Sequence, residues 1–311
     1  MFNILILLIV LISFLFCNEK VIEHFESPKK IAFCFLTIGD VNQHQLWYEF
    51  FKNNKGKFSI YVHPKYKLLV KSFFKNYIIK ENIKTGWGNI SLVDATNLLI
   101  KNALIDYNNY KIILVSDSCI PIKSFDYIYN KLIINNNSWF NYYKPREYID
   151  HHYKRILTLP KNIQKYTFIQ EQWMILSRDH AKLIILNNKN YRKLFTKDNQ
   201  IPDEMYYITL LYMLEPNIND QLEFSINVRA TYKKHDIVTF ANWYDDNNNL
   251  VNSYHPKKFN IISEKEYELL VNSNALFARK FVKNSNIQNY WKSIIEKDST
   301  DSLSNLKTSL A

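Results

Sequence analysis

The chain has 311 residues, of which 47% are hydrophobic and 22% are charged, and its formal net charge is +11. This length and balance support a large folded core and exclude a mainly disordered or fibrous protein. With only four glycines and three cysteines, the sequence also excludes dinucleotide and P-loop glycine motifs, a cysteine-rich zinc site and a dense disulfide framework.

The chain begins with an apolar run at residues 4–17, which Phe2 extends to a length close to that of a membrane-spanning helix. No small-residue cleavage pattern follows it, so we expect an uncleaved signal anchor at residues 1–18 and a short polar stem at residues 19–30. A cleaved signal peptide and a buried N-terminal helix are the alternatives.

Beyond the stem, apolar runs of strand length alternate with helical patterns. Strands are predicted at residues 31–37, 58–62, 77–80 and 111–116, and helices at 43–54, 68–74, 91–104 (capped by Ser91) and 125–134. This alternation predicts an α/β fold with a mostly parallel central sheet and flanking helices on both faces. Ligands of such sheets bind beyond the carboxyl ends of the strands.

The second half is less regular. Strands are predicted at residues 173–177 and 237–243, and helices at 178–186, 202–214, 264–272 and 287–297. No repeat or Pro-rich linker divides the chain, so we expect one catalytic domain at residues 31–285. A C-terminal helix and a loose tail are expected at residues 286–311.

The basic charge identifies no partner by itself. Lysines and arginines are scattered, and the densest short groups are pairs at residues 29–30, 233–234 and 257–258. A general enrichment in Lys, Asn and Ile accounts for much of the excess. Nucleic-acid binding would need the charges to cluster on one face. We therefore expect no nucleic-acid partner.

Pro202-Asp203-Glu204 is the most informative local motif. Proline and acidic residues suit the first turn of a helix, so simple helix initiation is one reading. The same helix dipole keeps a carboxylate ionised, as a general base requires, so a general base is the other interpretation of this motif.

Two further motifs bear on anion binding. Asp117-Ser118-Cys119 follows a strand at the place where sugar-nucleotide transferases hold a metal with Asp-x-Asp, but Cys119 replaces the second carboxylate. A leaving diphosphate would then need fixed cations, and Arg279-Lys280 lies between apolar residues. A surface ion pair is the alternative for these cations.

Nine short segments, in this order, resemble the core-2/I-branching β-1,6-N-acetylglucosaminyltransferase family, which includes peptide-O-xylosyltransferases and plant-type relatives. The segments are IAFCFLT (31–37), FSIYVHP (58–64), WGNISLVDA (87–95), LVSDSCIP (114–121), QWMILSRDHA (172–181), PDE (202–204), VTFANW (238–243), HP (255–256) and LFARKF (276–281). The resemblance covers about residues 30–283.

The resemblance implies a GT-A-type fold and an inverting, metal-independent transfer of a sugar from a UDP-sugar to a glycan or glycoprotein hydroxyl. The family's general base falls on Glu204, and its diphosphate-binding lysine falls on Lys280. A second basic residue falls on Lys257 or Lys258, and an acceptor-lining tryptophan falls on Trp243. No metal or other cofactor is expected.

The remaining expected site residues take their places from these motifs. Arg279 is expected at the diphosphate, Asp203 and Trp173 at the acceptor sugar, and Asp117 and Ser118 in the donor loop. Core packing is the alternative role for the tryptophans.

Several alternatives stay open. UDP-GlcNAc is the expected donor and UDP-xylose the alternative, while a catalytically silent glycan- or protein-binding relative is a competing function. Relatives often have Gly-Ser where this chain has Gln170-Glu171, and Cys34 and Cys119 leave room for at most one disulfide within the domain. The expected location is a secretory membrane, through residues 2–17, with a lumenal catalytic domain. A secreted or virion-associated protein is the alternative.

Overall fold

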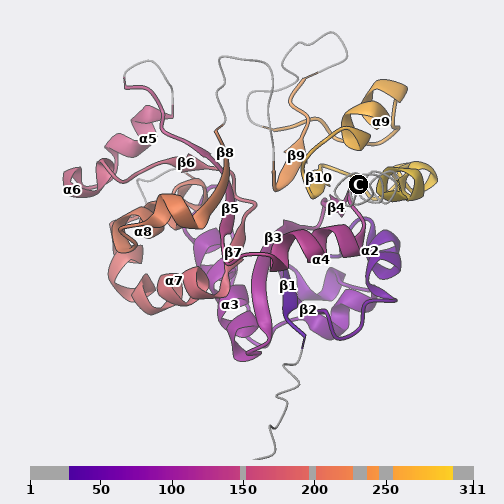
Figure 1. Cartoon of the computed structure of the whole chain (residues 1–311), viewed down its shortest axis with the longest axis horizontal. Helices are drawn as coiled ribbons and strands as arrows, with labels where there is room; N and C mark the ends of the chain where they lie inside the picture. Colours follow the sequence, from indigo (N-terminus) through magenta and orange to yellow (C-terminus); the bar gives the residue numbers. More distant parts are fainter. Residues whose placement is uncertain (1–27, 148–151, 196–200, 227–236, 245–254, 297–311) are drawn as a thin grey trace, which may run out of the picture.

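The computed structural model describes residues 28–147, 152–195, 201–226, 237–244 and 255–296 (Figure 1). The predicted anchor and most of the stem lie outside these residues. Within them, no helix is both long and apolar enough to cross a membrane.

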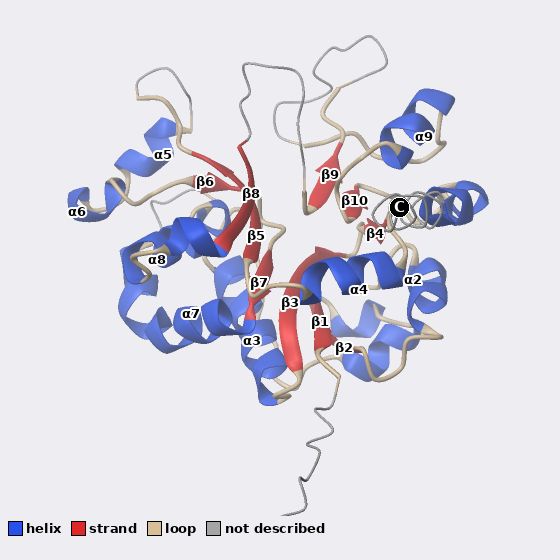
Figure 2. Ribbon diagram, in the orientation of Figure 1, coloured by secondary structure: helices blue, strands red, loops and turns tan. Residues whose placement is uncertain are grey.

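A mixed β-sheet runs through the middle of the molecule (Figure 2). Its strand order is β2-β1-β3-β7-β5-β6, and β8 pairs with β5. The strands are β1 (Lys30–Thr37), β2 (Phe58–Pro64), β3 (Asn109–Ser116), β5 (Ser138–Tyr143), β6 (Ile169–Gln170), β7 (Ile175–Ser177) and β8 (Leu222–Ile226).

The strand directions correct the expectation of a mostly parallel sheet. β2, β1 and β3 are parallel as predicted, and β8 is parallel to β5. However, β3 pairs antiparallel with β7, and β5 pairs antiparallel with both β7 and β6. An apolar run shows that a strand is buried but not its direction, which depends on the end of the sheet to which the connection returns.

A second, three-stranded sheet has the order β4-β10-β9. It comprises β4 (Ile120–Pro121), β10 (Phe277–Arg279) and β9 (Thr239–Ala241). In Figure 1 these strands lie beyond the upper end of β3, with β9 and β10 on the right of the molecule. This small sheet carries the LFARKF motif.

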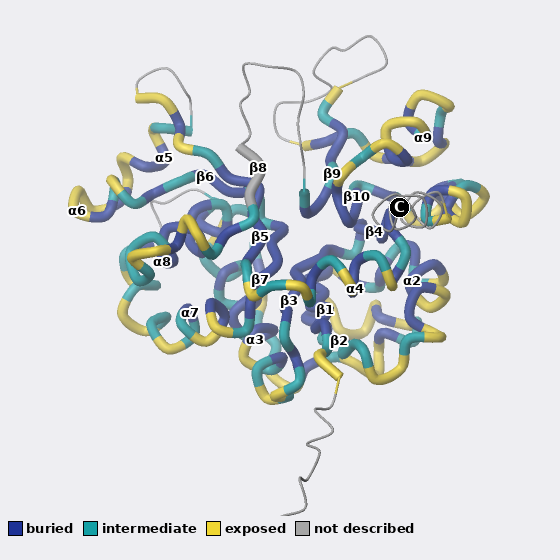
Figure 3. The backbone as a smooth tube through the Cα atoms, viewed as in Figure 1, coloured by how far each residue is buried: buried dark blue, intermediate teal, exposed yellow. Residues whose placement is uncertain are grey.

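Helices cover both faces of the large sheet. They are α2 (His44–Phe51), α3 (Ser91–Ile105), α4 (Phe125–Ile133), α5 (Tyr153–Leu157), α6 (Lys161–Gln164), α7 (Arg178–Tyr191), α8 (Tyr206–Leu214) and α9 (Glu264–Val271), and residues 288–296 are also helical. Three begin at serine N-caps whose hydroxyls accept a backbone N–H: Ser124, Ser177 and Ser263. Figure 3 shows buried strands between helices whose outer sides are exposed.

Four local predictions were wrong. The helix expected at residues 68–74 is two 3₁₀ turns, Lys67–Leu69 and Phe73–Tyr77, and the strand at 77–80 is one bridge between Val62 and Ile78. Ser91 is the first residue of α3, not its cap, because its hydroxyl accepts the N–H of Gly86. The helix expected from residue 202 is broken: a 3₁₀ turn at Pro202–Glu204 precedes α8.

An aromatic cluster joins the two sheets. The rings of Phe33, on β1, and Trp47, on α2, both contact Phe277 on β10, at centroid distances of 6.4 and 6.1 Å. The indole N–H of Trp47 also donates to the carbonyl of Cys119 (3.0 Å). This buried cluster fixes β10 against the carboxyl ends of the parallel strands. Cys34 and Cys119 are both buried free thiols.

Candidate active site

Glu204 is held by an arginine on a neighbouring helix. Arg155 of α5 donates from one guanidinium nitrogen to Glu204 Oε2 (2.9 Å) and from another to the carbonyl of Ile201 (2.7 Å). Ile201 has a left-handed φ of 54°, and its N–H donates to the carbonyl of Gly88 (3.1 Å). The motif that begins α8 is therefore fixed from two sides, with the Glu204 carboxylate aimed at Arg155.

The neighbouring carboxyls Asp203 and Glu204 have different surroundings. Burial raises the pKa of Glu204, but the charge and hydrogen bond of Arg155 oppose this effect. Asp203 is only 4% exposed, and its Oδ1 has no hydrogen-bond partner among the described residues. Burial, followed by the negative charge of Glu204, raises the pKa of Asp203 to about 7. Of the two, Glu204 is the carboxyl that is stabilised as an anion.

Arg279, at the end of β10, lies over the ring of Trp173, with its guanidinium carbon 4.7 Å from the ring centroid. Trp173 is buried, at 5% exposure, so the structure places it beneath a cation. Burial lowers the pKa of Arg279, and the negative charges of Glu171, Asp117 and Glu204 oppose that effect. Its Nε has no hydrogen-bond partner in the part of the chain that the structure describes. Arg279 is thus a partly buried cation whose charge interacts with both Glu204 and Asp117.

Lys280 belongs to a small group of cations. Burial and the charge of Arg279 lower its pKa, and Lys258 acts in the same direction. The pKa of His255 is lowered by burial and then by Lys280 and Arg279. Lys257, in contrast, forms an ion pair with the buried Glu266 (2.8 Å). Of the two lysines left open by the sequence, Lys258 is the one whose charge acts on Lys280.

The predicted donor loop joins the ends of β1 and β3. Asp117 Oδ2 accepts the backbone N–H of Ile38 (3.0 Å), and the carbonyl of Ser118 accepts the N–H of Phe281 (2.9 Å). Burial raises the pKa of Asp117, while the Ile38 N–H, Arg279 and then Lys280 oppose this rise. Asp117 is therefore both a loop tie and a countercharge to the cations.

Two tryptophans lie in segments that contact those carrying these charged residues. Trp243 is partly buried at the end of β9. Trp87 is 68% exposed, and its ring meets the His255 ring at a centroid distance of 5.8 Å. Glu171 accepts a hydrogen bond from the Asn141 amide (2.9 Å).

The structure therefore brings most of the predicted residues together: Asp117, Trp173, Asp203, Glu204, Lys258, Arg279 and Lys280 are linked by the contacts and electrostatic interactions above. Arg155 was not predicted from the sequence, because its segment contains no recognisable motif. An arginine next to an apolar residue in Lys154-Arg155-Ile156 was the available signal.

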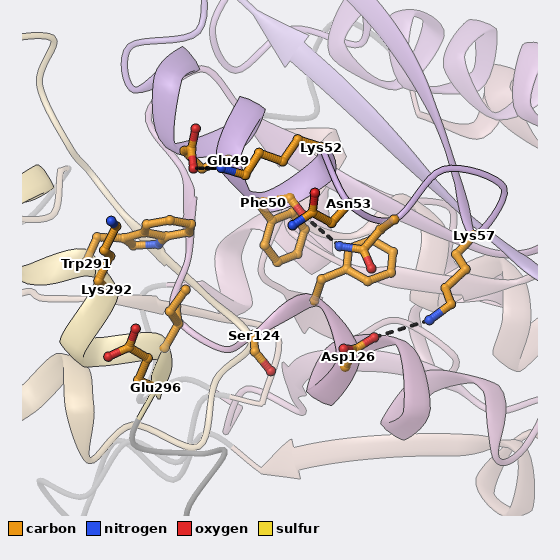
Figure 4. Close-up of a pocket in the computed structure, with 13 residues that line it drawn as sticks. Glu49, Phe50, Lys52, Asn53, Lys57, Ser124, Asp126, Trp291, Lys292 and Glu296 are labelled. Atoms are coloured by element: carbon orange, nitrogen blue, oxygen red, sulfur yellow. Dashed lines mark hydrogen bonds and ion pairs between the residues drawn. The ribbon is translucent and has the colours of Figure 1, made fainter.

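A hollow of about 600 Å³ lies elsewhere, between α2, the start of α4 and residues 288–296 (Figure 4). Ion pairs between Lys52 and Glu49, and between Lys57 and Asp126 (3.3 Å), occupy much of its rim. None of the predicted site residues lines it. Within the described ranges, no three His, Cys, Asp or Glu residues are grouped so that they could hold a metal ion.

Comparison with known proteins gives a family match. The model of the Core-2/I-Branching enzyme family matches residues 31–271. Glycosyltransferase BC10 of Oryza sativa subsp. japonica is 27% identical over 164 residues, which cover 50% of this chain and 40% of the rice protein. The match thus spans well under two thirds of that relative.

Two solved structures are distantly similar. One is a glycosyltransferase involved in the glycosylation of the major capsid of PBCV-1, with 10% identity and a TM-score of 0.39 over 85% of this chain and 98% of that one. The other is the galactosyltransferase LgtC, with 7% identity and a TM-score of 0.36 over 67% of this chain and 75% of that one.

Proposed function

The chain belongs to the core-2/I-branching enzyme family, a family of glycosyltransferases, and from this premise we propose that it transfers a sugar from a UDP-sugar to a glycan or glycoprotein hydroxyl. We propose a GT-A-type fold and an inverting reaction that needs no metal. The observation that carries the proposal is the ion pair of Glu204 with Arg155, beside the partly buried cation Arg279.

Glu204 is the proposed general base. It would take the proton from the acceptor hydroxyl as that oxygen attacks the anomeric carbon and the bond from that carbon to the diphosphate breaks. A positioned base of this kind contributes about 10²–10⁴-fold to the rate. Its ionised state is supported by Arg155, since a nearby cation favours the charged form of a carboxyl.

The cations are proposed to bind the leaving diphosphate. The positive charges of Arg279 and Lys258 both lower the pKa of Lys280, and Arg279 has a buried Nε that lacks a partner among the described residues. Mutual repulsion of such cations is relieved by an anionic ligand, and fixed positive charge stabilises the negative charge that develops on the leaving group. Asp117 would hold the loop beneath them.

The proposal also covers the acceptor side and the donor sugar. Trp243 is the proposed contact of the acceptor sugar. Trp173 and Asp203 would act on the acceptor side only indirectly, because Arg279 covers the Trp173 ring and Asp203 is 4% exposed. UDP-GlcNAc is the proposed donor, with UDP-xylose as the alternative. The apolar run at residues 2–17 supports a membrane-tethered enzyme with a lumenal catalytic domain.

The test is UDP release by the purified full chain, with UDP-GlcNAc or UDP-xylose and a panel of glycan acceptors, in EDTA and in Mn²⁺. Three proteins are compared: the wild type, Glu204→Gln, and Glu268→Gln as a control at an exposed glutamate of α9. We expect EDTA-resistant turnover in the wild type and the control and a loss of at least a hundredfold in Glu204→Gln.

Each other outcome removes a part of the proposal. Turnover that requires Mn²⁺ would refute the metal-free reaction. Full activity of Glu204→Gln would refute its role as the base. Absence of both turnover and UDP binding by calorimetry would favour a catalytically silent relative.

A further inference from the structure

The connection between β2 and α3 forms a basic surface outside the candidate active site. Residues 65–84 contain six lysines and a single glutamate, so twenty residues carry nearly half of the net charge of +11. The lysines are Lys65, Lys67, Lys71, Lys75, Lys80 and Lys84. Among the described residues, none of them forms an ion pair with a carboxylate. We call residues 65–84 the lysine-rich surface.

Large apolar side chains lie between these lysines and face solvent. Leu68 is 86% exposed, Leu69 56%, Tyr66 50% and Tyr77 40%. Single exposed apolar residues are common on soluble proteins, but a group of this size within one short segment marks an interaction surface. A surface that served only for solubility would not need leucine here.

The exposed residues stand on a firmly anchored backbone. The Asp40 carboxylate accepts the N–H groups of Lys71 and Ser72, both at 2.8 Å, and also the Ser72 hydroxyl. Val70 and Phe74 are buried, and Phe74 packs on Phe35 of the core at a centroid distance of 4.6 Å. Alternate residues therefore hold the segment in place while their neighbours point outward, so the surface is preformed.

We propose that the lysine-rich surface binds the headgroup region of an anionic lipid bilayer, with Leu68 and Leu69 entering the interface. Lysines are attracted to anionic headgroups, and leucine and tyrosine side chains are stabilised when they leave water and enter the bilayer interface at the same depth. A soluble polyanion, such as a nucleic acid or an acidic polysaccharide, would satisfy the lysines but offers no partner for exposed leucines. The combination of charge and apolar area therefore favours a bilayer.

The surface borders the candidate active site. The N–H groups of Lys65 and Tyr66 donate to the carbonyls of Thr37 and Ile38 (2.8 and 2.9 Å), and the Ile38 N–H donates to Asp117 of the proposed donor loop. A bilayer bound here would lie next to the ends of the parallel strands. The enzyme would then act on acceptors displayed close to the membrane, a consequence that rests on the proposed function, whereas lipid binding itself does not.

The test uses the full chain reconstituted in vesicles. Cys17 is replaced by serine, and Cys34 and Cys119 are buried, so a cysteine introduced at the surface is the one that a fluorophore labels. An environment-sensitive fluorophore is attached at Leu68→Cys or, as the matched control, at Leu186→Cys, which is 79% exposed on α7. The vesicles contain phosphatidylcholine alone or with about one third phosphatidylserine. The N-terminal run would insert in both, so a difference between them reports the folded domain.

We expect a blue shift and brighter emission at position 68 only with phosphatidylserine, reversed by high salt, and no change at position 186. Replacing Lys67, Lys71 and Lys75 by glutamine should weaken docking about fivefold per lysine while the circular dichroism spectrum is unchanged. Equal emission in the two lipids would overturn the proposal. An equally large shift on adding heparin without anionic lipid would assign the surface to soluble polyanions instead.

Discussion

Replacing Arg155 by glutamine tests whether this residue tunes the proposed base. Arg155 is 8% exposed and donates to Glu204 Oε2 at 2.9 Å. Without it, burial of Glu204 is opposed by more distant cations such as Arg279, so the pKa of the carboxyl rises. A protonated Glu204 cannot accept a proton from the acceptor. The acid limb of the rate profile should therefore move to higher pH.

The size of the effect follows from the distance and the exposure. Two unit charges at 2.9 Å interact by roughly 6 kcal/mol at an effective dielectric constant of about 20, and by roughly 1.4 kcal/mol in bulk water. Because the Glu204 side chain is 34% exposed, solvent screens the pair and the lower part of this range applies. With 1.4 kcal/mol for each pH unit, we expect the acid limb to move by about one to two units.

The assay is kcat/KM for UDP release from pH 5 to 9 in the wild type, Arg155→Gln and Arg155→Lys. The glutamine variant should lose activity mainly at low pH and recover part of it at high pH, while the lysine variant, which keeps the charge, should lie between the two. A uniform loss at every pH, with the acid limb unmoved, would show that Arg155 acts by another route, such as acceptor binding or stability. The thermal unfolding midpoints of all three proteins distinguish an effect on folding from an effect on the reaction.

Three further outcomes are expected. Lys280→Ala should weaken UDP binding in calorimetry by about 10–100-fold, since charge-assisted hydrogen bonds contribute about 1.5–3 kcal/mol, whereas exposed Lys283→Ala should change it little. Asp117→Asn keeps an acceptor for the Ile38 N–H but removes the negative charge beside the cations. UDP should therefore bind about three- to tenfold more tightly to this variant. If the variant instead bound UDP more weakly and the loss depended on Mn²⁺, Asp117 would be a metal ligand. Asp203 has a pKa of about 7 in the folded chain, so it binds a proton more strongly there than in the unfolded chain. The free energy of unfolding should therefore fall as the pH rises from about 4 to 7. In urea titrations over this pH range, Asp203→Asn should make that fall smaller.

The parallel half of the fold could be predicted because its signals are local. β1 and β3 are nearly continuous apolar runs, and α3 and α7 have clear helical periods. The missed strands are short or partly polar, as in β4 and β8, and they exist only because a neighbouring strand pairs with them. Such pairing is a tertiary effect, so no local pattern carries it.

The site shows the same division between local and tertiary information. Glu204 and Lys280 could be proposed as site residues because their motifs are contiguous, whereas the residues that interact with them come from distant segments. The lysine-rich surface was missed for a related reason: its lysines are separated by two to five positions and so form no run. Two 3₁₀ turns bring them to a common exposed segment.

The geometry also distinguishes between two adjacent carboxyls without help from the motif. Asp203 and Glu204 are both buried enough for their pKa values to rise, yet only Glu204 has an arginine at hydrogen-bonding distance. Asp203 has a buried oxygen with no partner among the described residues, so ionising it costs the full desolvation penalty. A general base must be an anion before it acts and must reach a substrate. Glu204, partly exposed and charge-paired, meets both conditions, and Asp203, 4% exposed, meets neither.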